Sequence, residues 1–138
     1  MSSLSRLGES TVPTSYAHAT GVPDGRIYDR SLCIPREGAI EVRFIRDGGA
    51  YAQGMTFHLK VDGCLIADLD PDESLRVWLN PGPHRMRIIM GFRKEFGIPR
   101  WLEIPERRTL DVELPSVGPC VIRLGYRGAR PLIQVLKS

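Results

Sequence analysis

The sequence predicts an all-β domain built as an antiparallel β-sandwich of about seven strands. Apolar and polar residues alternate in short runs, and turn residues separate these runs at intervals of 8–12 residues. No stretch has the 3.6-residue period of an amphipathic helix. A chain of 138 residues is long enough to bury a core of its own, so a single domain is expected.

Residues 1–38 are predicted to form a flexible or partly docked N-terminal arm, and residues 39–138 the β-sandwich domain. The arm is rich in Ser, Thr, Gly and Pro, and the part before about Gly25 has too little apolar surface to offset its ordering entropy. Its later part, residues 26–35, has enough apolar content to lie against the domain as a short edge strand. The domain then begins with a strand over residues 39–46, where apolar residues alternate with charged ones.

The first hairpin is predicted around Asp62-Gly63, which separates the alternating runs MTFHLKV and CLIADL. Asp-Gly favours a type I′ turn, because that turn needs positive φ at both central residues. The expected register pairs Val61 with Cys64 and Leu59 with Ile66. The other face of this hairpin would then carry His58, Lys60, Leu65 and Ala67.

A second hairpin is predicted across Asn80-Pro81-Gly82-Pro83, between SLRVWL and HRMRIIM. Pairing Leu79 with His84 keeps the apolar residues of both runs on one face. The further expected pairs are Val77 with Met86 and Leu75 with Ile88. The acidic segment Asp70-Pro71-Asp72-Glu73 between the two hairpins suits a type I turn.

Three further strands are predicted over residues 109–114, 120–124 and 132–136, the last apolar on both faces and therefore expected to be covered on two sides. The segment between Phe92 and Glu106 contains two prolines and a glycine and is expected to be a long connection without a helix. The predicted core between the sheets comprises Phe44, Leu59, Val61, Ile66, Leu75, Val77, Ile88, Val112 and Ile122.

The run VDGCLIADLDPDESLRVWLNPGPHRMRI resembles PEGA-like, immunoglobulin-like bacterial domains, in which a DG hairpin, a short acidic turn and a PG-x-H turn separate the strands. It also resembles small bacterial proteins of unknown function whose strand ends in "RD" before the same pattern, where this chain has Arg46-Asp47. The resemblance covers residues 39–91 and rests on turn residues. It implies an immunoglobulin-like fold and says almost nothing about activity.

The composition of the chain gives limited information about its partners and its cellular compartment. The net charge of +3 and the isoelectric point near 9.0 are far from the clustered positive charge of a dedicated nucleic-acid-binding protein. The three cysteines have no metal-ligand spacing, and Cys64 and Cys120 are expected to fill the core. The sequence has no signal-peptide apolar region and no membrane-spanning run, so a reduced, cytoplasmic setting is expected.

The sequence predicts no catalytic residue, no metal site and no cofactor. It lacks GxSxG, HExxH, P-loop and GxGxxG patterns. His84 follows the Pro-Gly-Pro turn and is expected to bond a nearby backbone carbonyl. The acidic residues Asp68, Asp70, Asp72 and Glu73 could offer oxygen ligands to Ca²⁺, but their spacing does not match a calcium loop. A solvated turn is therefore predicted for these acidic residues. For the protein as a whole, an uncharacterised enzyme remains an alternative function.

Two surfaces are candidate binding sites. The second hairpin would place Arg76, Trp78, Arg85 and Arg87 on one outward face, where opposed arginines need an acidic neighbour such as Asp111 or Glu113, or an anionic partner. The long connection interleaves aromatic and basic residues, which commonly anchor protein interfaces. These residues are Phe92, Arg93, Lys94, Phe96, Arg100 and Trp101, and they could instead plug the sandwich.

From these observations we predict a non-catalytic, protein-binding bacterial module, such as an adaptor, a secretion-system accessory or an immunity-type protein. Its main contact surface would be the connection between Phe92 and Glu106. Nucleic-acid or other anionic-ligand binding through the arginine-tryptophan face is the alternative, and it would show a steep dependence on salt.

Overall fold

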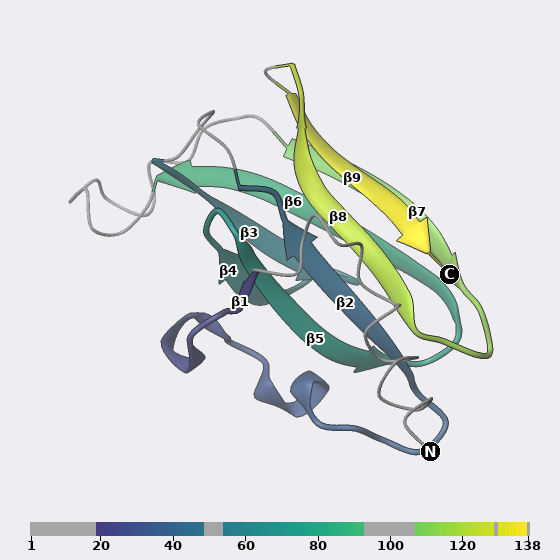
Figure 1. The fold of residues 1–138 in the computed structure, drawn as a ribbon. Helices are drawn as coiled ribbons and strands as arrows, with labels where there is room; N and C mark the ends of the chain where they lie inside the picture. Colours follow the sequence, from purple (N-terminus) through teal and green to yellow (C-terminus); the bar gives the residue numbers. More distant parts are fainter. Residues whose placement is uncertain (1–18, 49–53, 93–106, 129, 138) are drawn as a thin grey trace, which may run out of the picture.

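The computed structural model describes residues 19–48, 54–92, 107–128 and 130–137, and its regular elements are strands and two short 3₁₀ helices (Figure 1). None of the helices in these ranges is long and apolar enough to cross a membrane. The strands are β1 (Thr20–Gly21), β2 (Ile40–Arg46), β3 (Met55–Val61), β4 (Cys64–Leu69), β5 (Glu73–Leu79), β6 (Gly82–Phe92), β7 (Arg107–Leu114), β8 (Cys120–Arg127) and β9 (Arg130–Lys137). The 3₁₀ helices are η2 (Asp24–Arg26) and η3 (Arg30–Cys33).

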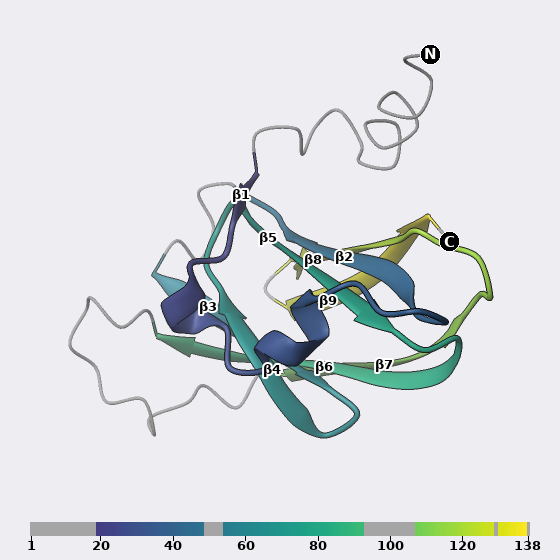
Figure 2. The same ribbon diagram turned by 90° about the horizontal axis from the view of Figure 1, so that it is seen from below.

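The strands form two sheets, one with the order β1-β5-β2-β8-β9 and the other with the order β4-β3-β6-β7. Figure 2 shows the two sheets as separate layers. The four-stranded sheet is antiparallel throughout. The five-stranded sheet is mixed, because β2 runs parallel to β8 and β1 runs parallel to β5. The prediction of a wholly antiparallel architecture is therefore wrong for this sheet.

The first hairpin forms where the sequence predicts it, with φ of 52° at Asp62 and 83° at Gly63. Val61 pairs with Cys64 as expected, but a bulge between Leu59 and Lys60 pairs Leu59 with Ala67 instead of Ile66. The extra residue brings both Ile66 and Ala67 into the core. The outward placement of Ala67 is wrong for this reason, and Cys64 is exposed at the hairpin tip instead of filling the core.

The predicted second hairpin does not form, because β5 and β6 belong to different sheets. β5 pairs with β2, placing Val77 opposite Val42, and β6 pairs with β3 and β7, placing Met86 opposite Val61. The Asn80–Gly82 region therefore carries the chain from one sheet to the other. The preceding β4–β5 turn also differs from the expected type I turn, since Asp72 has a φ of 62°.

A single hydrophobic core joins the two sheets. All nine predicted core residues are in it, each at most 8% exposed, so that prediction is confirmed. They come from seven strands: Phe44 on β2, Leu59 and Val61 on β3, Ile66 on β4, Leu75 and Val77 on β5, Ile88 on β6, Val112 on β7 and Ile122 on β8. Alternation puts the same residues on the inward face whether β5 and β6 pair with each other or lie in opposite layers.

The described part of the arm, residues 19–38, docks against both sheets. β1 adds to the edge of β5, and the backbone N–H of Val22 donates to the carbonyl of Ser74 at 3.0 Å. Further along, Ile27 forms a β-bridge with Ala67 of β4, and the N–H of Tyr28 donates to the carbonyl of Ile66 at 2.7 Å. Val22 is buried in the core cluster, so docking begins earlier in the chain than the sequence suggests.

Candidate functional site

β6 ends at Phe92, the first residue of the predicted contact surface. The other five residues proposed for it, Arg93, Lys94, Phe96, Arg100 and Trp101, lie outside the described residues. The described strands do show what this connection joins. β6 and β7 are adjacent antiparallel neighbours in the same sheet, and Ile89 pairs with Arg107. The connection is therefore the loop of a hairpin.

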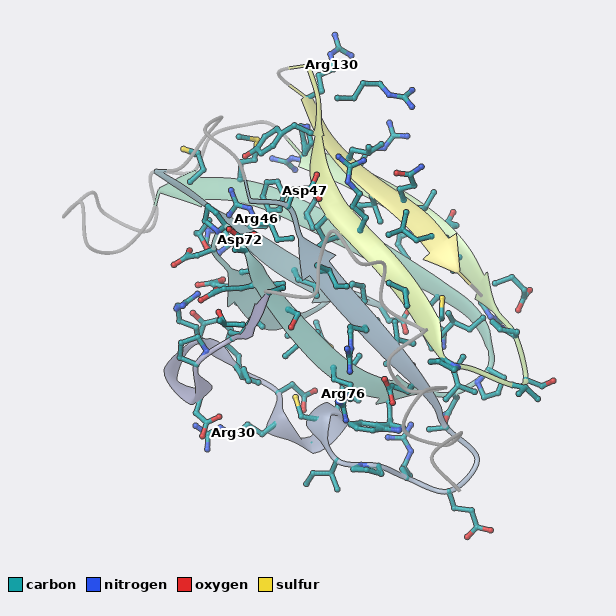
Figure 3. The ribbon with its side chains drawn as sticks, viewed as in Figure 1. Arg30, Arg46, Asp47, Asp72, Arg76 and Arg130 are labelled. Atoms are coloured by element: carbon teal, nitrogen blue, oxygen red, sulfur yellow. The ribbon has the colours of Figure 1, made fainter. Side chains whose placement is uncertain are left out.

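The predicted arginine-tryptophan face is divided between two sheets. Arg76 and Trp78 lie on β5, whereas Arg85 and Arg87 lie on β6, so the single face expected from the hairpin register does not exist. Figure 3 shows Arg76 on the β5 side of the molecule. Its guanidinium lies 6.0 Å from the centre of the Trp78 ring.

On β5, Arg76 still faces a like charge, which is Arg43 of β2. Oε2 of Glu41 lies 3.7 Å from a guanidinium nitrogen of each of these two arginines. Because one carboxylate sits between two opposed arginines, their repulsion is offset within the sheet.

On β6, Arg85 has the acidic partner that the sequence suggests. It pairs in register with Asp111 of β7, and its Nε donates to Oδ1 of Asp111 at 2.8 Å. This hydrogen bond raises the pKa of Arg85 and lowers the pKa of Asp111. Both side chains are largely exposed, so the pair contributes little to stability. Glu113, the other expected partner, lies opposite Pro83.

His84 connects the inter-sheet connection to the tip of the first hairpin. Its Nε2 lies 2.6 Å from the carbonyl oxygen of Asn80, so the predicted bond to a nearby backbone carbonyl is confirmed. Its Nδ1 lies 2.6 Å from Oδ2 of Asp62, and the backbone N–H of Arg85 donates to the other oxygen of that carboxylate at 2.9 Å. Both ring nitrogens of His84 therefore lie beside oxygen atoms, one from the Asp62 side chain and one from the Asn80 backbone.

These groups line an open depression of about 580 Å³, bounded by Asp62, Gly63, Pro83, His84, Arg85 and Asp111. Burial raises the pKa of Asp62, but hydrogen bonds from Arg85 and His84 outweigh it and hold that pKa below its usual value. The polar side chains in this depression bond to one another: His84 to Asp62 and Arg85 to Asp111. Each of the two carboxylates in the lining thus has a partner within the fold.

The acidic turn is a buried ionic cluster and not the solvated turn that its composition suggests. Arg26 of η2 binds the carboxylate of Glu73 through both terminal nitrogens, at 2.6 and 2.5 Å, and lies 3.3 Å from Asp70. The hydrogen bond to Glu73 raises the pKa of Arg26 despite its partial burial. Asp70 and Glu73 are at most 9% exposed. Their charges hold the arm in place.

Asp68 extends this cluster to the outward side of the four-stranded sheet. Its Oδ1 lies 2.6 Å from Nδ1 of His58, and its Oδ2 accepts a hydrogen bond from the hydroxyl of Tyr28 at 2.6 Å. His58 and Asp68 are both 6% exposed. The ring of His58 lies over Gly91, where a Cβ atom would collide with it. Sequence reasoning missed Arg26 and Tyr28, because a pairing across 40 or more residues leaves no local pattern.

Arg46 is buried at the end of β2 and ties three strands together. Its Nη1 donates to the carbonyls of Met55 at 2.8 Å and Leu69 at 2.7 Å, at the start of β3 and the end of β4. Its guanidinium lies 4.2 Å from the centre of the Phe57 ring. Figure 3 shows Arg46, Asp47 and Asp72 at the same end of the molecule. Arg46 of the Arg-Asp strand end noted in the sequence is thus a structural joint between β2, β3 and β4.

The remaining chemistry-bearing groups give no converging site in the described ranges. No three of their His, Cys, Asp and Glu side chains are arranged to hold a metal ion. Cys33, Cys64 and Cys120 are free thiols. Cys120 is fully buried in the core, as predicted, and burial raises the pKa of its thiol.

Comparisons with known proteins give this chain no family: no protein-family model matches it, and neither does any curated protein or solved structure.

Proposed function

We propose that this protein is a non-catalytic, protein-binding module whose contact surface is the β6–β7 connection. The supporting observation is topological. β6 and β7 are adjacent antiparallel strands, and two such strands need a loop of only 2–5 residues. This chain instead uses residues 93–106. A connection much longer than its topology needs is typical of a binding loop on a rigid scaffold.

The composition of this connection supports the same proposal. Phe96 and Trp101 are interleaved with Arg93, Lys94 and Arg100. Aromatic and arginine side chains are enriched among the residues that carry most of the energy of protein interfaces. A partner bound by these residues would offer an apolar surface to the aromatic rings and acidic groups to the basic side chains.

The ionic groups of the described residues also support a binding role over catalysis. His58, His84, Arg26 and Arg85 each bond to a carboxylate that the fold itself supplies. These contacts hold the arm, the turns and the strands in place. In the scaffold that carries the connection, these side chains therefore have structural roles.

The test compares Trp101→Ala with Trp78→Ala, which removes the other tryptophan, on β5. Proteins that co-purify with the wild-type chain would be identified, and the affinity of the isolated partner measured for each variant. We expect Trp101→Ala to weaken binding by about 2 kcal/mol or more with little change in thermal unfolding. Trp78→Ala should keep wild-type affinity.

A large loss of stability in Trp101→Ala would contradict the proposal. If Trp101→Ala lowers the free energy of unfolding by about 3–5 kcal/mol, the ring plugs the structure as a buried aromatic does. Replacing residues 93–106 with a short Gly-Asn hairpin loop gives a second test. The resulting chain should fold and lose the partner.

We further propose that the two sheets are an immunoglobulin-like β-sandwich related to PEGA-like bacterial domains, and that the protein works in a reducing, cytoplasmic setting. The turn residues support the first proposal, since the Asp62-Gly63 turn and the Pro-Gly-x-His segment both have structural roles. The three free thiols support the second.

A further inference from the structure

Several arginines on the outer faces of the two sheets have a carboxylate partner within the fold. In the five-stranded sheet, Arg43 and Arg76 face each other, and Oε2 of Glu41 lies 3.7 Å from a guanidinium nitrogen of each. In the four-stranded sheet, Arg85 is bonded to Asp111, its neighbour in register. Like charges that lie directly opposite destabilise a sheet, so a carboxylate between them restores stability.

One pair of opposed cations has no such carboxylate. Lys60 of β3 lies directly opposite Arg87 of β6. The residues on either side of each of them point into the core, so alternation places both side chains on the outer face of the four-stranded sheet. Nε of Arg87 is buried without a hydrogen-bond partner. In the part of the chain that the structure describes, neither Lys60 nor Arg87 forms an ion pair.

Two carboxylates flank this pair on the outer face, and both are bonded elsewhere. Asp111 of β7 binds Arg85. Asp68 of β4 binds His58 and the hydroxyl of Tyr28. The opposed cations therefore keep an unrelieved repulsion and a buried donor without an acceptor, and both features cost stability. Departures of this kind from a well-satisfied fold are expected at functional sites, where a ligand relieves them.

A third cation continues this surface toward the β6–β7 connection. Arg107 pairs with Ile89, which lies two residues beyond Arg87 on β6, and its side chain is exposed. Arg87 and Arg107 thus occupy neighbouring positions of one face. We call Lys60, Arg87 and Arg107 the cationic row. Arg107 is also the first residue of β7, where the connection ends, so the row adjoins the contact surface proposed above.

We propose that the cationic row binds the carboxylate groups of an acidic segment in the protein partner. This inference rests on the proposed function and names the chemistry of the partner. Glu41 supplies the geometric precedent within this fold, because its single carboxylate reaches two opposed cations on neighbouring strands. A carboxylate of the partner would take the same place between Lys60 and Arg87.

An acidic protein segment fits this face better than a nucleic acid does. In their described residues, β3, β6 and β7 place no Phe, Tyr or Trp side chain on the outer face, since Phe57 points into the core. Proteins that bind single-stranded nucleic acid without sequence preference stack the bases on such rings. The row offers charge without a stacking platform.

The test titrates the full chain with an oligo-glutamate peptide at low ionic strength and follows binding by calorimetry. We expect binding that weakens as salt is added, because mobile ions screen exposed charges. Lys60→Gln and Arg87→Gln should each raise the dissociation constant about fivefold or more. Arg76→Gln is the matched control and should bind like wild type, because Arg76 already has Glu41 beside it. Circular dichroism of each variant checks the fold.

Lys60→Glu separates binding from stability. The change places a carboxylate opposite Arg87, so the repulsive pair becomes attractive and the unfolding temperature should rise above that of wild type. The same variant should bind oligo-glutamate more weakly than Lys60→Gln does. If Lys60 and Arg87 had only a packing role, reversing the charge would lower stability and leave binding unchanged.

Three results would overturn the proposal. A wild-type chain that does not bind oligo-glutamate at low ionic strength has no such site. Binding that neither Lys60→Gln nor Arg87→Gln weakens uses another surface. Tighter binding of single-stranded DNA than of oligo-glutamate would assign the row to nucleic acid.

The two assays keep this inference separate from the proposed function. Titration with oligo-glutamate needs no partner, so its failure removes the cationic row alone. The effect of Trp101→Ala on the partner tests the connection, and its failure removes the proposed contact surface alone.

Discussion

The carboxylate of Asp62 and the ring of His84 are joined at 2.6 Å across 22 residues of sequence. This contact links the tip of a hairpin in the four-stranded sheet to the segment through which the chain passes between sheets. A type I′ turn and the segment that crosses between the sheets are therefore held by one side-chain contact. The contact makes stability depend on the charge of Asp62.

Asp62→Asn tests that dependence. Asn-Gly keeps the preference for a type I′ turn, so the variant removes the charge without disturbing the backbone. The pKa of Asp62 is lowered in the folded protein, so its stabilisation is present above the ordinary carboxyl pKa of about 3.9 and is lost as pH falls through the folded value. Wild type should unfold at a higher temperature than the variant at neutral pH. The difference in unfolding temperature between wild type and variant should begin to decrease below about pH 4 and approach zero as the pH falls below the pKa of Asp62 in the folded protein. A difference that does not change with pH would contradict this role of Asp62.

Arg26→Met tests the attachment of the arm. The change leaves Glu73 and Asp70 buried without the guanidinium that both of them contact. Because Arg26 is itself partly exposed, we expect a loss of about 2–3 kcal/mol in urea unfolding, below the cost of breaking a fully buried pair. Arg30→Met is the control, since Arg30 and Asp24 are largely exposed and 3.9 Å apart. That variant should stay within about 0.5 kcal/mol of wild type.

Arg46→Met tests the joint between β2, β3 and β4. Methionine keeps the apolar stem but removes the guanidinium that donates to the carbonyls of Met55 and Leu69, of which the carbonyl of Leu69 also accepts from the hydroxyl of Thr56. We expect a loss of about 2–3 kcal/mol, because buried acceptors that lose their donor carry a desolvation cost. Arg76→Met, at a half-exposed position on β5, should change stability by less than about 0.5 kcal/mol. Equal effects of the two changes would show that Arg46 contributes only its stem.

Gly91→Ala tests the packing of His58. A Cβ atom at position 91 would collide with the imidazole ring, which Asp68 holds in place. Overpacking of this kind should cost about 1–3 kcal/mol in thermal or urea unfolding. Gly25→Ala is the matched control, because a Cβ there meets nothing within 4 Å. If Gly91→Ala unfolds like wild type, the ring of His58 is free to move aside.

Residue alternation in the sequence predicted the core better than the strand pairing. Val77 and Ile88 are both buried in the same core, although they lie in opposite sheets and not side by side in a hairpin. A Pro-Gly turn reverses the chain, but its residues do not specify whether the next strand returns to the same layer or crosses to the other. The contact between His84 and the carbonyl of Asn80 forms here in a segment that crosses between the sheets.

The sequence predicted a wrong placement for Ala67 and for the acidic turn, each for a different physical reason. The bulge between Leu59 and Lys60 adds one residue and brings Ala67 to the inward side, and no residue in that run signals it. The acidic turn is buried because Arg26, 47 residues earlier in the sequence, reaches Glu73. Local composition can predict a turn, but it cannot predict a partner that arrives from a distant segment.

The docked arm also gives the two sheets a preferred way to separate. It bonds to β5 in one sheet and to β4 in the other, so one side of the two layers is strapped together. On the opposite side, β7 and β9 end their sheets without such a strap in the described residues. Among the described residues, the molecule therefore has a segment bonded to both sheets only on the arm side, while β7 and β9 lie beside each other on the other side. Thermal breathing should open it from the β7 and β9 side, and hydrogen exchange should reach those strands before it reaches β4 and β5.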